Sequence, residues 1–113
     1  MGNFTIKKGS NGQYYFNLKA SNGEIILQSE GYLTKLNCQN GISSVRINSQ
    51  VNSHYVKKIA INGEYYFNLI ASNGQVIGVS ETYLSIQGRE KGVESVKINA
   101  PNAVVSDLTW IIV

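Results

Sequence analysis

The chain has 113 residues, a formal net charge of +3 at pH 7 and one cysteine. This length allows a domain with a real apolar core, and the lone cysteine excludes an intramolecular disulfide and a cysteine-based zinc site. The charge is too small for a dedicated phosphate-binding surface. The sequence has no stretch of about 20 apolar residues that could span a membrane and no secretory signal pattern, so we expect a cytoplasmic protein.

Most of the chain is a repeat. An offset of 51 residues places 12–48 on 63–99 without a gap, and about twenty of the aligned positions are identical. Each copy of such a repeat is normally one supersecondary unit. The connector 49–54 is short and polar, and one half alone, at roughly fifty residues, would have a marginal core. We therefore expect one globular domain over 1–113, with repeats at about 4–50 and 55–107 and an apolar tail at 108–113.

The first elements in the chain have the two-residue period of β-strands. In 4–8, Phe4 and Ile6 lie on one face, and 55–59 is the counterpart of this strand in the second copy. Residues 13–20 separate in the same way. The expected core face of this strand holds Tyr14, Phe16, Leu18 and Ala20, and the opposite face holds Tyr15, Asn17 and Lys19.

Asn-Gly pairs follow each of these strands and predict hairpin turns. The pair at 22–23, repeated at 73–74, is typical of a two-residue type I′ loop. That loop would set Lys19 opposite Ile26 and Leu18 opposite Leu27 in a strand at 24–29. Simple alternation then places Ile26, and Ile77 in the second copy, on the face away from the core.

After position 30 the period changes, and 33–47 is predicted to be a helix. Its buried seam would be Cys38, Gly41, Ile42 and Val45, echoed by Gly92, Val93 and Val96. Thr34 and Ser85 are the expected N-caps. A glycine in a helix interior costs about 1 kcal/mol relative to alanine, so the repeated Gly41 and Gly92 indicate close packing against the sheet. After the second helix, 103–105 has strand propensity, and the apolar tail has no counterpart in the first repeat.

The repeated motifs are Gly-x-Tyr-Tyr-Phe-Asn-Leu, Ala-Ser-Asn-Gly, Ser-Glu-x-Tyr and Gly-Ile/Val-x-Ser-Val-Arg/Lys-x-Asn. This combination, present twice, resembles the YegP-like family of small bacterial proteins over nearly the whole chain. The resemblance implies an α+β fold of two tandem β-β-β-α-β units. Their strands would join into a single antiparallel sheet with two helices packed on one face and C-terminal strands exchanged between the repeats. It implies no biochemical activity, because the family has none that is established.

A search for chemistry finds no catalytic constellation, cofactor motif or metal-ligand cluster, and we expect a protein that is not an enzyme. Glu30 and Glu81 are the repeated carboxylates, and one carboxylate per copy is not an acid/base pair. We interpret them as helix N-terminal charges or as ion-pair partners of Arg46 or Lys97. A Cys38–His54 dyad is the remaining catalytic alternative, and it is disfavoured because Cys38 lies on the buried seam.

The open face of the sheet is the stronger candidate for function. Its residues are expected to be Tyr15, Asn17, Lys19 and Ile26 in the first repeat and Tyr66, Asn68, Ile70, Ile77 and Val79 in the second. The second set is more apolar and predicts an interaction or structural module. Such a module would form a homodimer through this face or through the tail, unless Trp110–Val113 folds over the face. The alternative is weak binding of nucleic acid or another anionic ligand through Tyr15, Lys19, Tyr66 and the lysines at 7, 8, 57 and 58.

Overall fold

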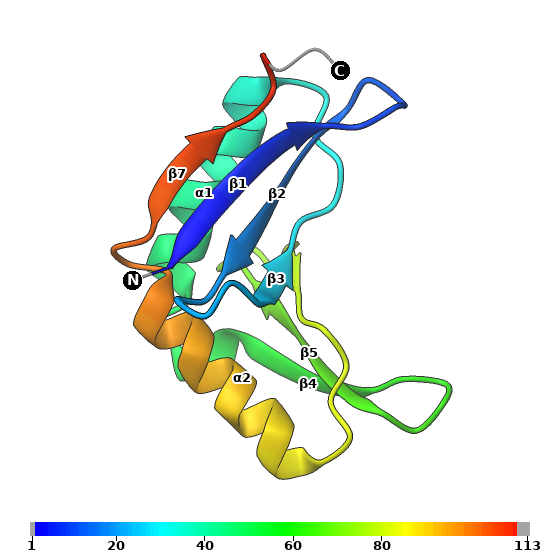
Figure 1. Cartoon of the computed structure of the whole chain (residues 1–113). Coiled ribbons are helices and arrows are strands. Elements are labelled where there is room, and N and C mark those ends of the chain that lie inside the picture. Colours follow the sequence, from blue (N-terminus) through cyan, green and yellow to red (C-terminus); the bar gives the residue numbers. More distant parts are fainter. Residues whose placement is uncertain (1, 111–113) are drawn as a thin grey trace.

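A computed structural model describes residues 2–110 and shows one mixed sheet with two helices, an α+β fold (Figure 1). The strands and helices of the first repeat are β1 (Asn3–Lys8), β2 (Tyr14–Lys19), β3 (Ile25–Gln28) and α1 (Lys35–Asn48). A short 3-10 turn, Asn52–His54, leads into the second repeat. This contains β4 (Tyr55–Ile59), β5 (Tyr65–Ile70), β6 (Val76–Val79), α2 (Ile86–Asn99) and β7 (Val104–Asp107). Thr34 and Ser85 are the N-caps, as expected, and accept hydrogen bonds from the amides of Asn37 and Gly88.

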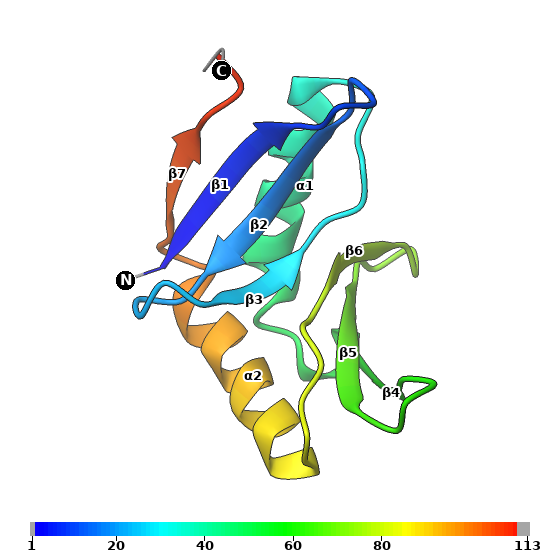
Figure 2. The same ribbon diagram turned by 45° about the vertical axis from the view of Figure 1, so that its right-hand side comes forward.

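The seven strands lie in the order β4-β5-β6-β3-β2-β1-β7. The two repeats meet at β3 and β6, where Gln28 pairs with Val79, its own counterpart under the repeat. A pseudo-twofold axis therefore passes between these two residues. Because a single residue pair joins the two halves of the sheet, the strands on either side can run in clearly different directions, as Figure 2 shows.

The exchange of the C-terminal strand between repeats is confirmed, with one addition. Strand β7 follows α2 of the second repeat but pairs with β1 of the first (Figure 1). Its pairing with β1 is parallel, whereas all the other strand pairs in residues 2–110 are antiparallel. The sheet is therefore mixed at this edge.

The helices share one face of the sheet and cross the boundary between repeats. Helix α1 contacts β2 of its own repeat and β6 of the other, and α2 contacts β5 and β3 in the same way. One cluster of buried residues draws on both halves, with Phe4, Ile6, Leu18, Leu69 and Phe67 fully buried. The expected core face of β2 is confirmed, since Phe16 and Leu18 are buried and Tyr14 and Ala20 pack against them.

The predicted type I′ loops are wrong. Only the glycines of the Asn-Gly pairs have positive φ, near +80° to +86°, whereas a type I′ turn needs positive φ at both central residues. In the turn at 20–24 the amide of Gly23 donates to the carbonyl of Ala20, and the amide of Ala20 donates to the carbonyl of Glu24. This is a type I turn followed by a glycine bulge, and the other three Asn-Gly turns have the same bonds.

The register changes again inside the hairpins, and this moves two isoleucines into the core. Lys19 pairs with Ile25 while Leu18 pairs with Leu27, which leaves Ile26 as the extra residue of a bulge. The same shift at 69–70 leaves Ile77 unpaired in the ladder. Ile26 and Ile77 are 6% and 8% exposed. Their expected place on the open face is therefore wrong, and Ile25 and Val76 lie there instead.

Candidate functional site

A single transverse row of side chains crosses the open face from one edge of the sheet to the other. Each member pairs with the next across neighbouring strands, so the row is Val56, Asn68, Val79, Gln28, Asn17, Thr5 and Ser106. The side-chain oxygens of Asn17 and Asn68 are buried and have no hydrogen-bond partner. Both lie beside the pseudo-twofold axis. The members of the row from the first repeat are all polar, whereas Val56 and Val79 make its second-repeat part partly apolar.

The sheet brings most of the predicted surface residues to this face, but not to one place. Tyr15, Asn17, Lys19, Tyr66, Asn68, Ile70 and Val79 are all half-buried, and Ile77 is in the core. The two halves are antiparallel across the central pair, so Tyr15 and Tyr66 lie on opposite sides of the row, each toward its own hairpin turn. They do not form one aromatic platform.

An apolar hollow of about 630 Å³ opens on the second repeat beside Tyr66. Its wall is formed by the β4–β5 turn, by Val79 of β6 and by Thr82 just after it. Ile61, at the tip of that turn, is fully exposed. The side chains that line the hollow are mostly apolar or uncharged, so it is suited to an apolar side chain and not to an ionic ligand.

In the first repeat the equivalent tyrosine, Tyr15, lies against its own turn. There Asn11 Nδ2 donates to Tyr15 Oη at 2.8 Å, which holds the tyrosine ring against the turn. A Cβ added to Gly9 would lie 2.8 Å from Cε2 of that ring. The second repeat has this Cβ, because Ala60 occupies the position of Gly9. Tyr66 therefore cannot take the position of Tyr15, and the space stays open.

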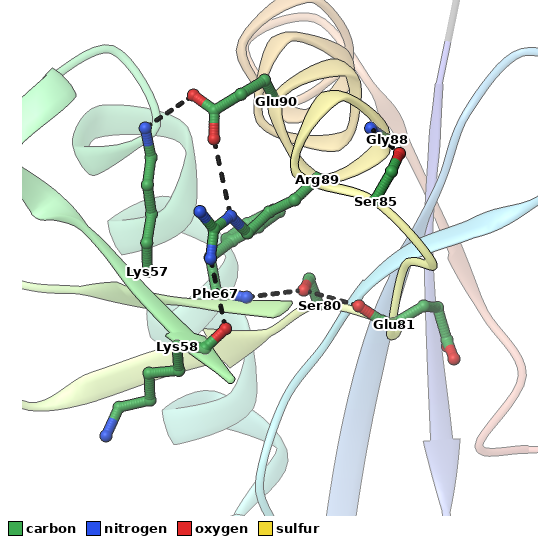
Figure 3. A network of polar contacts seen from close by, with 9 residues as sticks. All are labelled: Lys57, Lys58, Phe67, Ser80, Glu81, Ser85, Gly88, Arg89 and Glu90. Atoms are coloured by element: carbon green, nitrogen blue, oxygen red, sulfur yellow. Dashed lines mark hydrogen bonds and ion pairs between the residues drawn. The ribbon is translucent and has the colours of Figure 1, made fainter. Parts of the chain in front are cut away.

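A polar cluster lies on the helix side of β4 and was not predicted. Lys57 Nζ is 2.6 Å from Glu90 Oε1, and Arg89 Nη1 donates to the carbonyl oxygen of Lys58 at 3.2 Å (Figure 3). Arg89 Nε and Glu90 Oε2 are 3.5 Å apart, but both atoms are buried without forming a hydrogen bond. The pKa of Glu90 is lowered, chiefly by the hydrogen bond from Lys57.

The first repeat has apolar or neutral residues at these positions. Under the repeat offset, Lys57 replaces Ile6 and Arg89 replaces Cys38. Ile6 and Cys38 are fully buried beneath the β1–β7 edge, whereas Lys57 is 45% exposed. The cluster could have been predicted from the sequence, because two apolar residues that face the core in the first copy are replaced by charged residues in the second.

One of the two repeated carboxylates, Glu81, makes a contact that was not predicted. Glu81 Oε1 accepts a 2.6 Å hydrogen bond from Gln28 Nε2 and so joins the two repeats. Arg46 donates to backbone carbonyls, and Lys97 pairs with Glu94, so neither is the ion-pair partner of Glu30 or Glu81. The expected ion pairs are wrong.

The cysteine and the histidine are held apart by α1. Cys38 lies near its start, and His54 Nδ1 is 2.6 Å from Asn48 Oδ1 at its end. Ten residues of helix span about 15 Å. Burial raises the pKa of the Cys38 thiol to about 11, so the reactive thiolate is disfavoured. Among residues 2–110, no group of three His, Cys, Asp or Glu side chains could hold a metal ion, and no helix is both long and apolar enough to cross a membrane.

The fold and the site define a duplicated α+β protein with one shared core and two unequal open surfaces. The chain belongs to the family described as a domain of unknown function, DUF1508, whose model matches residues 10–55 and 60–107. It is 52% identical over 109 residues to the UPF0339 protein YegP of Yersinia pestis, covering 96% of this chain and 97% of that protein. A UPF0339 protein of Acinetobacter baylyi is also 52% identical, over 94% of this chain and 96% of its own length.

Two solved structures have the same fold. The solution structure of YegP from Escherichia coli, titled a protein of unknown function, gives a TM-score of 0.93 at 48% identity, covering 98% of this chain and 96% of that one. A UPF0339 protein of Shewanella oneidensis gives 0.90 at 45% identity, over 96% and 92% of the two chains. The family resemblance found in the sequence is therefore confirmed, and these relatives have no assigned activity in their descriptions.

Proposed function

We propose that the chain is a non-enzymatic interaction module that associates with a second copy of itself through the apolar hollow of the second repeat. The observation that supports this is an apolar knob directly beside an apolar hole: Ile61 is fully exposed and forms one rim of the hollow. In a twofold interface the same patch is used by both subunits. Ile61 of each copy can then enter the hollow of the other.

The magnitudes favour a weak dimer. Full burial of an isoleucine side chain is worth about 1.5–3 kcal/mol, and a twofold interface buries two of them. Loss of translational and rotational freedom costs at least about 4 kcal/mol. The two isoleucines together therefore contribute about 3–6 kcal/mol, close to the lowest value of this cost, and the apolar residues around the hollow, among them Tyr66 and Val79, add to it. We expect association that depends strongly on protein concentration.

The difference between the repeats indicates that the apolar residues around the hollow bind another molecule and do not stabilise the core. In the first repeat the matching positions are Gly9, Ser10 and Gln28, and Tyr15 is hydrogen-bonded to Asn11 of the turn. The second repeat has Ala60, Ile61 and Val79 there. Exposed apolar side chains beside a hollow are typical of interaction sites. The chain as described to Trp110 follows the opposite edge of the sheet, beside β1, and so leaves this face open; 111–113 lie outside the described residues.

Sedimentation velocity over a wide range of concentrations tests the proposal. The intact chain should associate as its concentration rises, and Ile61→Ala should remain monomeric. Ile47→Ala is the matched control, because Ile47 is also an exposed isoleucine, at 71%, but lies on α1. A monomer at every concentration, or an Ile61→Ala variant that associates as well as the original chain, would overturn the proposal.

Weak binding of nucleic acid or another anionic ligand is the alternative, and the geometry gives it less support. Base stacking on a sheet needs aromatic rings on one continuous platform beside basic residues, and Tyr15 and Tyr66 are separated by the transverse row. Titration of a labelled single-stranded oligonucleotide at low salt should show no saturable binding. Saturable binding that Lys58→Gln weakens would favour the alternative.

A further inference from the structure

The outer edge of β4 is open where the equivalent edge of β1 is covered. Strands β1 and β4 pair with β2 and β5 in the same register, so Ile6 lies opposite Phe16 as Lys57 lies opposite Phe67. Strand β7 pairs with the outer side of β1. In residues 2–110, β4 pairs with β5 alone. The second repeat therefore lacks a strand that the first repeat has.

Strand β7 shows how a segment sits on such an edge. It runs parallel to β1, and the amide of Leu108 donates to the carbonyl of Ile6 at 2.9 Å. The carbonyl of Ile6 thus faces away from β2. Because Lys57 has the register of Ile6, and side-by-side residues alternate in a ladder, the backbone N–H and C=O groups of Lys57 and Ile59 face away from β5. Unpaired groups in such a row are a template for another strand.

We propose that this edge binds an extended acidic segment of a protein partner by parallel strand addition. The side chains around the edge carry a net positive charge, which favours an acidic partner. Lys57 and Lys58 of β4 and Arg89 of α2 are positive, and Glu90 cancels one of these charges. Arg89 is only 11% exposed, and its Nε atom has no hydrogen bond. An acidic side chain on an added strand supplies negative charge to a cluster in which Glu90 alone faces three positive side chains.

The first repeat contains the same arrangement with its ligand already in place. Asp107 of β7 points to the helix side, where its Oδ2 is 3.0 Å from Lys35 Nζ at the start of α1. A carboxylate at the corresponding place on a strand beside β4 would face Lys57 and Arg89. The proposed contact therefore copies one that the protein already makes, with the positive charges moved to the strand and to the first turns of α2.

The same charges disfavour other occupants. Pairing of two β4 strands from two copies would bring Lys57 and Lys58 of each against those of the other, and like charges across strands are destabilising. Lysines on an edge strand also discourage unspecific pairing with neutral strands. The edge lies beside the hollow of the proposed dimer but is a separate surface, so either proposal can fail alone.

An alternating peptide is a direct probe of the site. We would titrate the ¹⁵N-labelled full chain with the octapeptide Val-Glu-Val-Glu-Val-Glu-Val-Glu at low salt, and with its Val-Lys counterpart as the control for charge. The acidic peptide should shift the amide signals of β4 and slow hydrogen exchange at the amides of Lys57 and Ile59. Slowed exchange reports backbone pairing, which a surface ion pair alone would not cause.

Charge reversal of one edge lysine provides the matched test. Lys57→Glu should weaken binding of the acidic peptide by tenfold or more. Lys58→Glu should weaken it less, because Lys58 lies opposite Tyr66 on the open face of the same strand. Thermal unfolding of both variants checks that they fold. The proposal is overturned if millimolar acidic peptide leaves β4 unchanged, if the lysine peptide binds equally well, or if the exchange of Lys57 and Ile59 stays fast while the peptide is bound.

Discussion

Arg46 should be the most important charged residue for the stability of the C-terminal strand. Its Nη1 donates to the carbonyls of Ala100 and Pro101, and its Nη2 donates to the carbonyl of Ala103 at 2.7 Å. These carbonyls lie at the end of α2 and in the segment that leads to β7. A positive charge at a helix C-terminus is favourable. Arg46 therefore joins α1 of the first repeat to the last part of the second.

The repeat supplies a control at the equivalent position. Lys97 is the counterpart of Arg46. Instead of binding backbone carbonyls, its Nζ forms an ion pair with Glu94 at 3.3 Å, and the Glu94 side chain is 65% exposed. Both cations also lie over a ring, Arg46 over Phe4 at 5.1 Å and Lys97 over Tyr55 at 5.9 Å. The carbonyl at the end of α1 does not need Lys97, because the hydroxyl of Tyr55 donates to the carbonyl of Ser49 at 2.8 Å.

The expected magnitudes differ enough to measure. A hydrogen bond from a charged group is worth about 1.5–3 kcal/mol net, and Arg46 makes three bonds that share two donor nitrogens, so Arg46→Met should lower the free energy of unfolding by about 2–4 kcal/mol. Lys97→Met loses an exposed ion pair, worth about 0–1 kcal/mol. Urea unfolding measures both values. In Arg46→Met, native-state hydrogen exchange should also accelerate at Leu108, whose amide bonds to Ile6.

Two outcomes would refute this reasoning. Equal destabilisation by Arg46→Met and Lys97→Met would mean that the loss of charge, and not the three carbonyl contacts, determines the effect. A loss below about 0.5 kcal/mol in Arg46→Met would be typical of an ordinary surface substitution. It would show that these contacts do not stabilise β7.

Three further predictions concern packing and titration. Gly92→Ala should destabilise the fold by about 1–2 kcal/mol in urea unfolding, because overpacking against the Tyr83 hydroxyl exceeds the gain of about 1 kcal/mol in helix propensity; an unchanged midpoint would contradict it. The pKa of Asp107 is lowered to about 2, chiefly by hydrogen bonds from Thr109. Its contribution to stability is therefore present above the ordinary value of 3.8 and lost as the pH falls through about 2, and Asp107→Asn should flatten the thermal midpoint over that range. Cys38 should react with iodoacetamide much more slowly in the native chain than in urea, and equal rates would contradict its burial.

The sequence predicted those features that depend on one copy of the repeat. Thr34 and Ser85 were found as N-caps because a helix start leaves amides that a hydroxyl can satisfy. Gly41 was expected to allow close packing, and a Cβ there would clash with the hydroxyl of Tyr32. These are local rules, in which the residue and its partner are close in the sequence or fixed by periodicity.

The bulges were missed because alternation assumes a regular ladder. Asn-Gly is common in type I′ turns, but the turns here extend to a fifth residue and are followed by a second irregularity at Ile26 and Ile77. A shift of one residue moves a side chain to the other face. The composition of the open face was therefore predicted correctly for β2, β5 and Val79, and incorrectly for Ile26 and Ile77.

The polar cluster and the parallel strand were missed for a different reason. Both depend on how the two copies differ, whereas the repeat motifs show only what they share. Lys57 and Glu90 are 33 positions apart, and the cluster becomes visible only when Ile6 and Cys38 are compared with their replacements together. The parallel pairing of β7 follows from where α2 ends.

The end of α2 explains why a duplicated chain has unequal edges. Helix α1 delivers the chain to the start of β4, the outer strand of the other half. Helix α2 ends at the corresponding place, beside the start of β1, where the amide of Val104 donates to the carbonyl of Gly2. That place is already occupied by β1, so the chain continues outside it as β7. Among residues 2–110, only the β1 edge is covered in this way. At the covered edge Ile6 and Cys38 are fully buried, and at the uncovered edge Lys57 and Arg89 stand in their places. The difference between the two edges therefore directs the proposed contacts with other molecules to the second repeat.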